Sequence, residues 1–157
     1  MHLHQAEGGF CISRRRVRFP QAGTVTTSAP LTAECVLSDA PDSLAVARRV
    51  TRLALLAWIG DGPAVDDALL VVTELATNAL RHGDGHPVLR LSVEGTDIRV
   101  EVFDDNPEFP VRRHPGTDGG WGLALVDRLS SVRGSAPHGR GKVVWCVLPA
   151  SSAELAG

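Results

Sequence analysis

Residues 63–83 read PAVDDALLVVTELATNALRHG, and this stretch carries helix signals at both ends. Pro63 suits a first helical position, where its missing N–H would find no partner in any case. Asp66 and Asp67 place negative charge near the positive end of the helix dipole. Gly83 supplies the backbone freedom that a helix end often needs. The sequence therefore predicts a helix from Pro63 to Gly83, around which the rest of the chain is arranged.

Two stripes run along this predicted helix. The apolar stripe has helical spacing and consists of Val65, Leu69, Val72, Ala76 and Ala79. The polar stripe consists of Asp67, Glu74, Asn78 and Arg81. Glu74 and Asn78 are four residues apart, so they share a face and are suited to act as a proton acceptor and a neutral metal ligand. The alternative is a solvated face of an amphipathic helix, and the spacing alone favours that alternative.

Length and charge limit the classes of protein to consider. The chain has 157 residues, which suits one domain. We expect a flexible N-terminal tail over residues 1–30, a domain over residues 31–150 and a short tail over residues 151–157. No apolar run approaches the roughly 18 residues that span a bilayer. A net charge of −2 and a pI near 6.3 give no indication of a nucleic-acid partner. We therefore expect a cytoplasmic protein without direct nucleic-acid or membrane binding.

The cysteines and basic residues give no strong functional signal. Cys11, Cys35 and Cys146 are far apart and odd in number, which favours reduced thiols over a zinc site or a disulfide framework. The arginine run near residues 14–18 is better explained as a solvated tail than as a binding patch. Lys142 is the only lysine beside fifteen arginines, which we interpret as coding bias.

The other predicted elements alternate between helix and strand. Residues 33–37 are a short strand candidate, and a helix follows with Ser38 or Asp39 as its cap and Pro41 in its first turn. Its predicted apolar face consists of Leu44, Ala47, Val50, Leu53, Ala54 and Ala57. Residues 87–94 and 98–103 alternate as an antiparallel hairpin.

The C-terminal third completes the sheet and adds one helix. A long loop over residues 105–120 precedes a short helix over 121–130, and strands follow at 132–133 and 142–148. The fold class is then an α/β two-layer sandwich, with about three helices on one face of a mixed, mostly antiparallel sheet.

Three motifs follow one another along the chain and carry a family resemblance. They are ELATNALRHG at 74–83, FDDNP at 103–107 and GWGLALV at 120–126. Their order resembles the GHKL ATPase superfamily, which includes gyrase and the histidine kinases. Within it, the likeness is to the anti-sigma-factor serine kinases found in actinobacteria, and it covers roughly residues 32–149. The resemblance implies a Bergerat-type ATP-binding fold, with ATP held between helices and sheet.

The resemblance also implies roles for particular residues. Glu74 would be the catalytic base, Asn78 the Mg²⁺ ligand and Asp104 the acceptor of the adenine amino group. A set of further nucleotide-binding positions is implied around the glycine motif and the helix end: Gly119, Gly120, Gly122, Leu123 and His82. The implied cofactors are ATP and Mg²⁺. Arg112, Arg113 and His114 are candidates to cover the phosphates, with an exposed basic loop as the equal alternative.

The implied activity is phosphorylation of an anti-anti-sigma antagonist protein by a serine kinase that also binds a sigma factor; a homodimer is possible. One departure matters, because the family's adenine motif usually continues Asp-x-Gly-x-Gly and here Asp104 is followed by Asp105-Asn106-Pro107. That departure favours the alternative function, a non-catalytic module that binds nucleotide or a partner and sequesters a regulatory protein.

Overall fold

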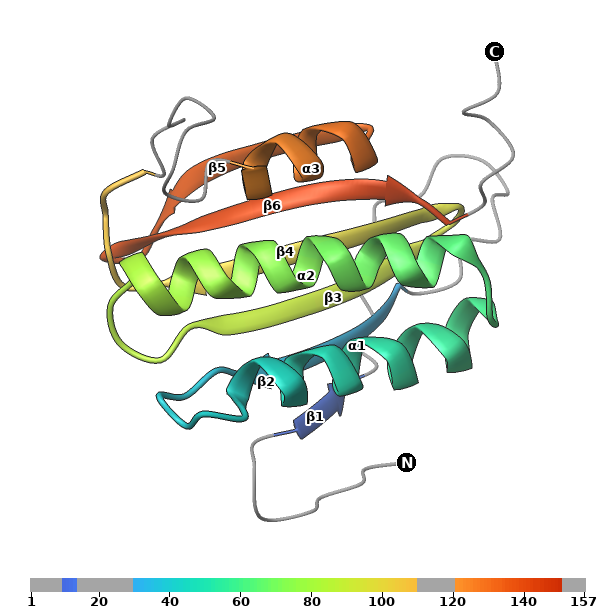
Figure 1. Ribbon diagram of the computed structural model, residues 1–157, viewed down its shortest axis with the longest axis horizontal. Coiled ribbons are helices and arrows are strands. Elements are labelled where there is room, and N and C mark those ends of the chain that lie inside the picture. The colour runs from blue at the N-terminus through green and yellow to red at the C-terminus, as the bar shows by residue number, and fades with distance from the viewer. Residues whose placement is uncertain (1–9, 14–29, 110–120, 151–157) are drawn as a thin grey trace, which may run out of the picture.

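The computed structural model describes residues 10–13, 30–109 and 121–150 of the chain. It is a two-layer α/β sandwich in which the three helices lie on one face of a six-stranded sheet (Figure 1). The strand order is β1-β2-β3-β4-β6-β5. Every described strand pair is antiparallel, so the sandwich prediction is confirmed while the parallel component of a mixed sheet is not found among these strands.

Helix α2 (Pro63–His82) lies in the middle of the helical layer and matches the sequence prediction at both ends. All five residues of the predicted apolar stripe are buried, and Gly83 follows as the C-cap with its N–H donating to Ala79 O. Leu75 and Val71 join that stripe in the core. The helix is fixed mainly by burial of this face, because an isolated helix of this length is marginal in water.

Helix α1 (Ser43–Ile59) corrects two details of the prediction. It begins after Pro41 and not around it: Asp42 is the N-cap, no side chain caps the helix, and Ser43 Oγ instead accepts a hydrogen bond from Ser38 N. The predicted apolar face is also shifted. Leu53 is 59% exposed, whereas Leu55 is fully buried, because the side that meets the sheet is set by packing that the sequence alone does not show.

The strands β2 (Leu31–Val36), β3 (Val88–Glu94) and β4 (Asp97–Asp104) show strict alternation between two faces. Side chains on the helix-facing side are buried, and the β3–β4 hairpin turns at Gly95, which has a φ of 60°. On the helix-free face, Arg99 lies 4.4 Å above the ring of Trp145, so Trp145 is not part of the core between helices and sheet. The alternation places Asp104 on the helix-facing side.

Strand β1 (Phe10–Ser13) lies inside the segment that was expected to be an unstructured tail. It pairs antiparallel with β2, in the register Phe10 with Cys35. A four-residue strand has little signal of its own, and only the open edge of β2 gives it a partner. The rest of the expected tail lies outside the described residues, as does the segment 151–157.

The C-terminal elements are α3 (Trp121–Leu129), β5 (Val132–His138) and β6 (Gly141–Pro149). The short helix and the last strand are confirmed, while β5 is longer than predicted. Strand β6 pairs with β4 on one side and β5 on the other, which carries residues near the C-terminus into the centre of the sheet. That position brings β6 against the end of β4.

Candidate functional site

Helix α2 presents Glu74 and Asn78 on the flank that faces away from α1. The flank toward α1 is marked by Thr73, whose hydroxyl receives a hydrogen bond from Arg48. Successive helical residues are rotated by about 100°, so Glu74 and Asn78 lie about 100° and 140° around the helix from Thr73. Figure 1 shows α2 between α1 and α3. The angles from Thr73 therefore turn Glu74 and Asn78 toward the α3 flank of the helix. The shared face predicted from their spacing is consistent with this arrangement.

Neither side chain has a partner in the described part of the chain. Glu74 and Asn78 are half-buried, and neither makes a hydrogen bond or an ion pair with any described residue. Polar groups that fold into a partly buried position normally find partners in protein or water. The carboxylate and the carboxamide, half-buried on one helix flank with no partner in residues 10–13, 30–109 and 121–150, are therefore available to a ligand.

The end of β4 holds a buried ion pair. Lys142 Nζ lies 3.0 Å from Asp104 Oδ1, and the exposed fractions of the side chains are 6% for Lys142 and 2% for Asp104. The two residues are directly paired across β4 and β6, so both side chains lie on the helix-facing side of the sheet. Asn106 N also donates to Asp104 Oδ1, at 2.8 Å. Asp104 is thus a strand-end carboxylate held by one cation and one backbone amide.

Asn106 connects the end of β4 to the end of α2. Its side-chain amide donates to His82 O at 2.7 Å, and its backbone carbonyl accepts from Lys142 Nζ at 3.0 Å. The backbone of Asp105 adds a bond from its N–H to Asp84 O, at 3.1 Å. The C-terminal end of α2 is therefore fixed to the strand end that carries Asp104. His82 takes part through its backbone, and its side chain is exposed.

Two glycines from other parts of the chain lie against Asp104. A Cβ at Gly141 would stand 1.9 Å from Asp104 O, and a Cβ at Gly83 would stand 3.0 Å from the Asp104 side chain. Neither position has room for a side chain without a shift of backbone. This chain lacks the glycines that usually follow the aspartate in the family motif, and the glycines that lie against Asp104 come from the end of α2 and the start of β6.

The glycine motif is described only in part. Gly122 is the second residue of α3, and Leu123 is half-buried in the first turn of that helix. Gly119 and Gly120 lie outside the described residues, as do Arg112, Arg113 and His114. Helix α3 lies beside α2, and the two helices are in contact.

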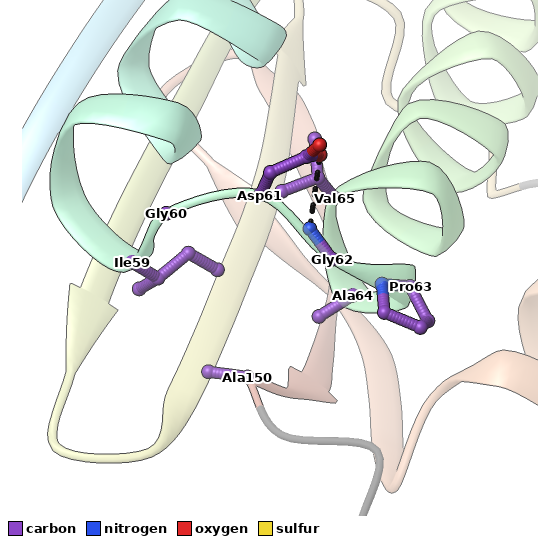
Figure 2. Close-up of a pocket in the computed structure, with 8 residues that line it drawn as sticks. All are labelled: Ile59, Gly60, Asp61, Gly62, Pro63, Ala64, Val65 and Ala150. Carbon is purple, nitrogen blue, oxygen red and sulfur yellow. Dashed lines mark hydrogen bonds between the residues drawn. The ribbon is translucent and has the colours of Figure 1, made fainter.

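A small pocket lies at the opposite end of the sandwich. It has a volume of about 220 Å³ and is lined by the α1–α2 connection and by Ala150 (Figure 2). The Asp61 carboxylate at its rim accepts a hydrogen bond from Gly62 N within the same turn. Strand β6 runs between the two regions, with Lys142 near its start and Ala150 just after its end. None of the residues predicted for the site lines this pocket.

A family comparison identifies the domain. The sequence model of the histidine kinase-like ATPase domain family matches residues 37–148 of the chain. The chain belongs to this family. The matched range includes α2, the Asp104–Lys142 pair and α3, and the GHKL superfamily resemblance of the motifs is thereby confirmed.

Solved structures give a weaker likeness to a histidine kinase. The chain is similar to the histidine kinase domain of the Erythrobacter litoralis EL346 blue-light-activated histidine kinase, with 25% identity and a TM-score of 0.45. The match covers 68% of this chain and 60% of that one, so this chain spans less than two thirds of that domain. No curated protein matches the sequence.

Within the histidine kinase-like ATPase domain, the sequence did not predict that Lys142 and Asn106 would contact Asp104. One signal was present, because Lys142 is the only lysine in an arginine-rich chain and stands at a helix-facing position of an apolar strand. No local pattern connects it with Asp104, which is 38 residues away.

No group of three or more His, Cys, Asp or Glu side chains is placed to hold a metal ion in the described part of the chain. The helices in that part include none that is long and apolar enough to cross a membrane.

Proposed function

We propose that this protein binds ATP and Mg²⁺ beside α2 and the end of β4, and that it is a protein-serine kinase of the anti-sigma type. One observation carries the proposal: Glu74 and Asn78 are half-buried on the flank of α2 toward α3, and neither has a partner among the described residues. Asp104 stands where β4 meets the end of that helix. Domains of the histidine kinase-like ATPase family bind ATP, and this chain has the residue types that such a ligand requires.

Each residue has a distinct task in the proposed reaction. Asp104 accepts a hydrogen bond from the exocyclic amino group of the base, and the Asn78 side-chain oxygen is a hard ligand suited to Mg²⁺. Glu74 takes the proton from the attacking serine hydroxyl, one helical turn from Asn78. The ATP–Mg²⁺ complex supplies the phosphoryl group to be transferred. We assign Gly119, Gly120, Gly122, Leu123 and His82 to the nucleotide as well.

The proposed partners rest on the order of the three motifs in the sequence. An anti-sigma kinase binds a sigma factor and phosphorylates an anti-anti-sigma antagonist, and we propose both kinds of partner for this protein.

A second candidate function is a non-catalytic binding module. The observation in its favour is the sequence Asp105-Asn106-Pro107 in place of the glycines that usually follow the adenine-binding aspartate. In that case, the domain would sequester a regulatory protein with nucleotide bound only as a structural element, or without nucleotide.

The deciding experiment is calorimetric titration of ATP into the purified protein with and without Mg²⁺. We expect Mg²⁺-dependent binding that weakens at least about tenfold in Asp104→Ala, because the base loses its hydrogen-bond acceptor. The matched control is Asp105→Ala, which removes the neighbouring carboxylate, itself paired with exposed Arg140. Phosphate transfer to a serine of a candidate antagonist then tests the kinase.

Absence of binding at millimolar ATP would contradict the proposal and leave the partner-binding module. ATP binding and hydrolysis without transfer to any antagonist would contradict the serine kinase while retaining the nucleotide site.

A further inference from the structure

We propose that Lys142 is a positioning residue that sets the base specificity of the nucleotide site by keeping Asp104 a charged carboxylate with one oxygen available. In this role Lys142 selects a base with an exocyclic amino group over one with a carbonyl at the same position. The inference rests on the proposed ATP binding and extends it to a residue that acts through Asp104.

The two oxygens of Asp104 have different surroundings. Oδ1 accepts hydrogen bonds from Lys142 Nζ and from Asn106 N. No described residue donates to Oδ2, and the described residues include no fully buried side-chain oxygen without a partner. Oδ2 therefore has no donor among the described residues and remains as the acceptor for a ligand.

Burial makes the charge of Asp104 depend on Lys142. The Asp104 side chain is nearly inaccessible, and an isolated carboxylate in such a place would take up a proton to avoid a buried charge. The ammonium group 3.0 Å away supplies the compensating charge. An ionised carboxylate only accepts hydrogen bonds, whereas a protonated one also donates. Lys142 thus determines which hydrogen-bonding character the ligand meets.

The surrounding backbone holds this arrangement in place. Lys142 Nζ also donates to Asn106 O, so the same ammonium fixes both the carboxylate and the chain that follows it. Gly83 lies against the Asp104 side chain and Gly141 lies against the Asp104 backbone, too close in both cases for a Cβ, so the strand end that carries the carboxylate is closely packed. A fixed acceptor discriminates between donor and acceptor groups on a base more strongly than a mobile one.

The chain offers a matched control two residues away. Arg140 pairs with Asp105 at 3.1 Å, across the same two strand ends, but the Arg140 side chain is 82% exposed. Replacement of Arg140 removes one positive charge from the same hairpin but no hydrogen bond or ion pair of Asp104. A comparison of Lys142→Met with Arg140→Met therefore separates the specific pair from the general loss of positive charge.

The test compares binding of ATP and of inosine triphosphate, which carries a carbonyl in place of the amino group. We expect the wild type to prefer ATP by about 100-fold or more, since a carbonyl facing an acceptor-only carboxylate leaves both unpaired. In Lys142→Met the protonated carboxylate is able to donate to the carbonyl, so the preference falls at least about tenfold. Arg140→Met keeps the wild-type preference.

The outcomes separate the two proposals. A wild-type preference retained in a folded Lys142→Met protein would overturn the role of Lys142 and leave ATP binding intact. Failure of the wild type to bind ATP would overturn the nucleotide site and this inference with it. If Lys142→Met does not fold, the variant Asp104→Asn/Lys142→Met removes both charges. Its carboxamide both donates and accepts, so the preference is expected to be lost, and a retained preference would overturn the inference.

Discussion

Lys142 Nζ and Asp104 Oδ1 lie 3.0 Å apart in a buried ion pair, although 38 residues separate them along the chain. They occupy directly opposed positions of β4 and β6. The free energy of such a pair is asymmetric. Removal of one partner leaves a buried group that must either keep an uncompensated charge or be neutralised, and both cost free energy, while removal of both partners leaves no such group.

Loss of the cation alone should therefore destabilise the domain. We expect Lys142→Met to lower the free energy of unfolding by about 3 kcal/mol, and Asp104→Asn/Lys142→Met to recover most of that loss. Urea denaturation of the variants measures both. Arg140→Met should leave the urea midpoint unchanged because its ion pair is solvent-exposed. Equal destabilisation by the single and double variants would show that Lys142 acts through packing alone.

Replacement of the proposed base should separate binding from transfer. Glu74→Gln keeps the size of the side chain but cannot accept a proton, so we expect phosphate transfer to fall about 10²- to 10⁴-fold with little change in ATP affinity. Single-turnover transfer and calorimetry measure the two effects. Asp67→Asn, on the same stripe of α2, is the control and should retain transfer. Transfer by Glu74→Gln at the wild-type rate would remove Glu74 from this role.

Helix α1 supplies a test of its corrected apolar face. Leu55 is fully buried and Leu53 is 59% exposed, two residues away on the same helix. We expect Leu55→Ala to cost about 2–5 kcal/mol of stability, through lost apolar contact and a residual cavity. Leu53→Ala should change stability by less than about 0.5 kcal/mol. Similar losses for both variants, measured by thermal or urea unfolding, would contradict this packing of α1.

Arg48 joins α1 to α2 and should contribute more to the stability of the domain than the neighbouring Arg49. Its guanidinium donates to Leu69 O at 3.3 Å and to the Thr73 hydroxyl. We expect Arg48→Met to lower stability by about 1–2 kcal/mol, because α2 loses a hydrogen-bond donor at its flank. Arg49→Met, at an exposed position, should have no measurable effect. Unfolding curves in which both variants equal the wild type would show that this bridge contributes nothing to stability.

The buried cysteines should be unreactive in the native protein. Burial raises the pKa of the Cys146 thiol to about 12, and it raises the pKa of Cys35 as well. Thiolates are the nucleophiles, so we expect little alkylation of either residue by iodoacetamide at pH 8 until the chain is denatured. Peptide-resolved mass spectrometry measures the extent of alkylation at each cysteine. Rapid native alkylation of Cys146 would contradict its burial.

The same pKa shift has a consequence for stability at high pH. Both thiols are protonated in the folded and unfolded chain below the ordinary pKa of 9.0, and the stabilising contribution of Cys146 is complete there. As the pH rises from about 9 to about 12, the unfolded chain releases this proton first, so stability falls. Cys146→Ala should make the alkaline loss smaller than in the wild type.

The sequence predicted the elements whose signals are local. Pro63, Gly83 and the apolar period between them set α2, and alternation with a turn at Gly95 set the β3–β4 hairpin. The fold class and the family followed from the order of such elements and motifs. These predictions succeed because turns, caps and periodic faces depend on residues near one another in the chain.

The tertiary structure alone decided the contacts between distant segments. It paired β1 with the open edge of β2, turned Leu53 of α1 to solvent and placed Lys142 against Asp104. Each of these outcomes depends on which surfaces pack against each other across the sheet. The interaction energy between two surfaces cannot be read from the sequence of either segment alone. The sequence therefore determined the helices, the strands and the candidate residues, whereas packing determined the charged surroundings in which Asp104 operates.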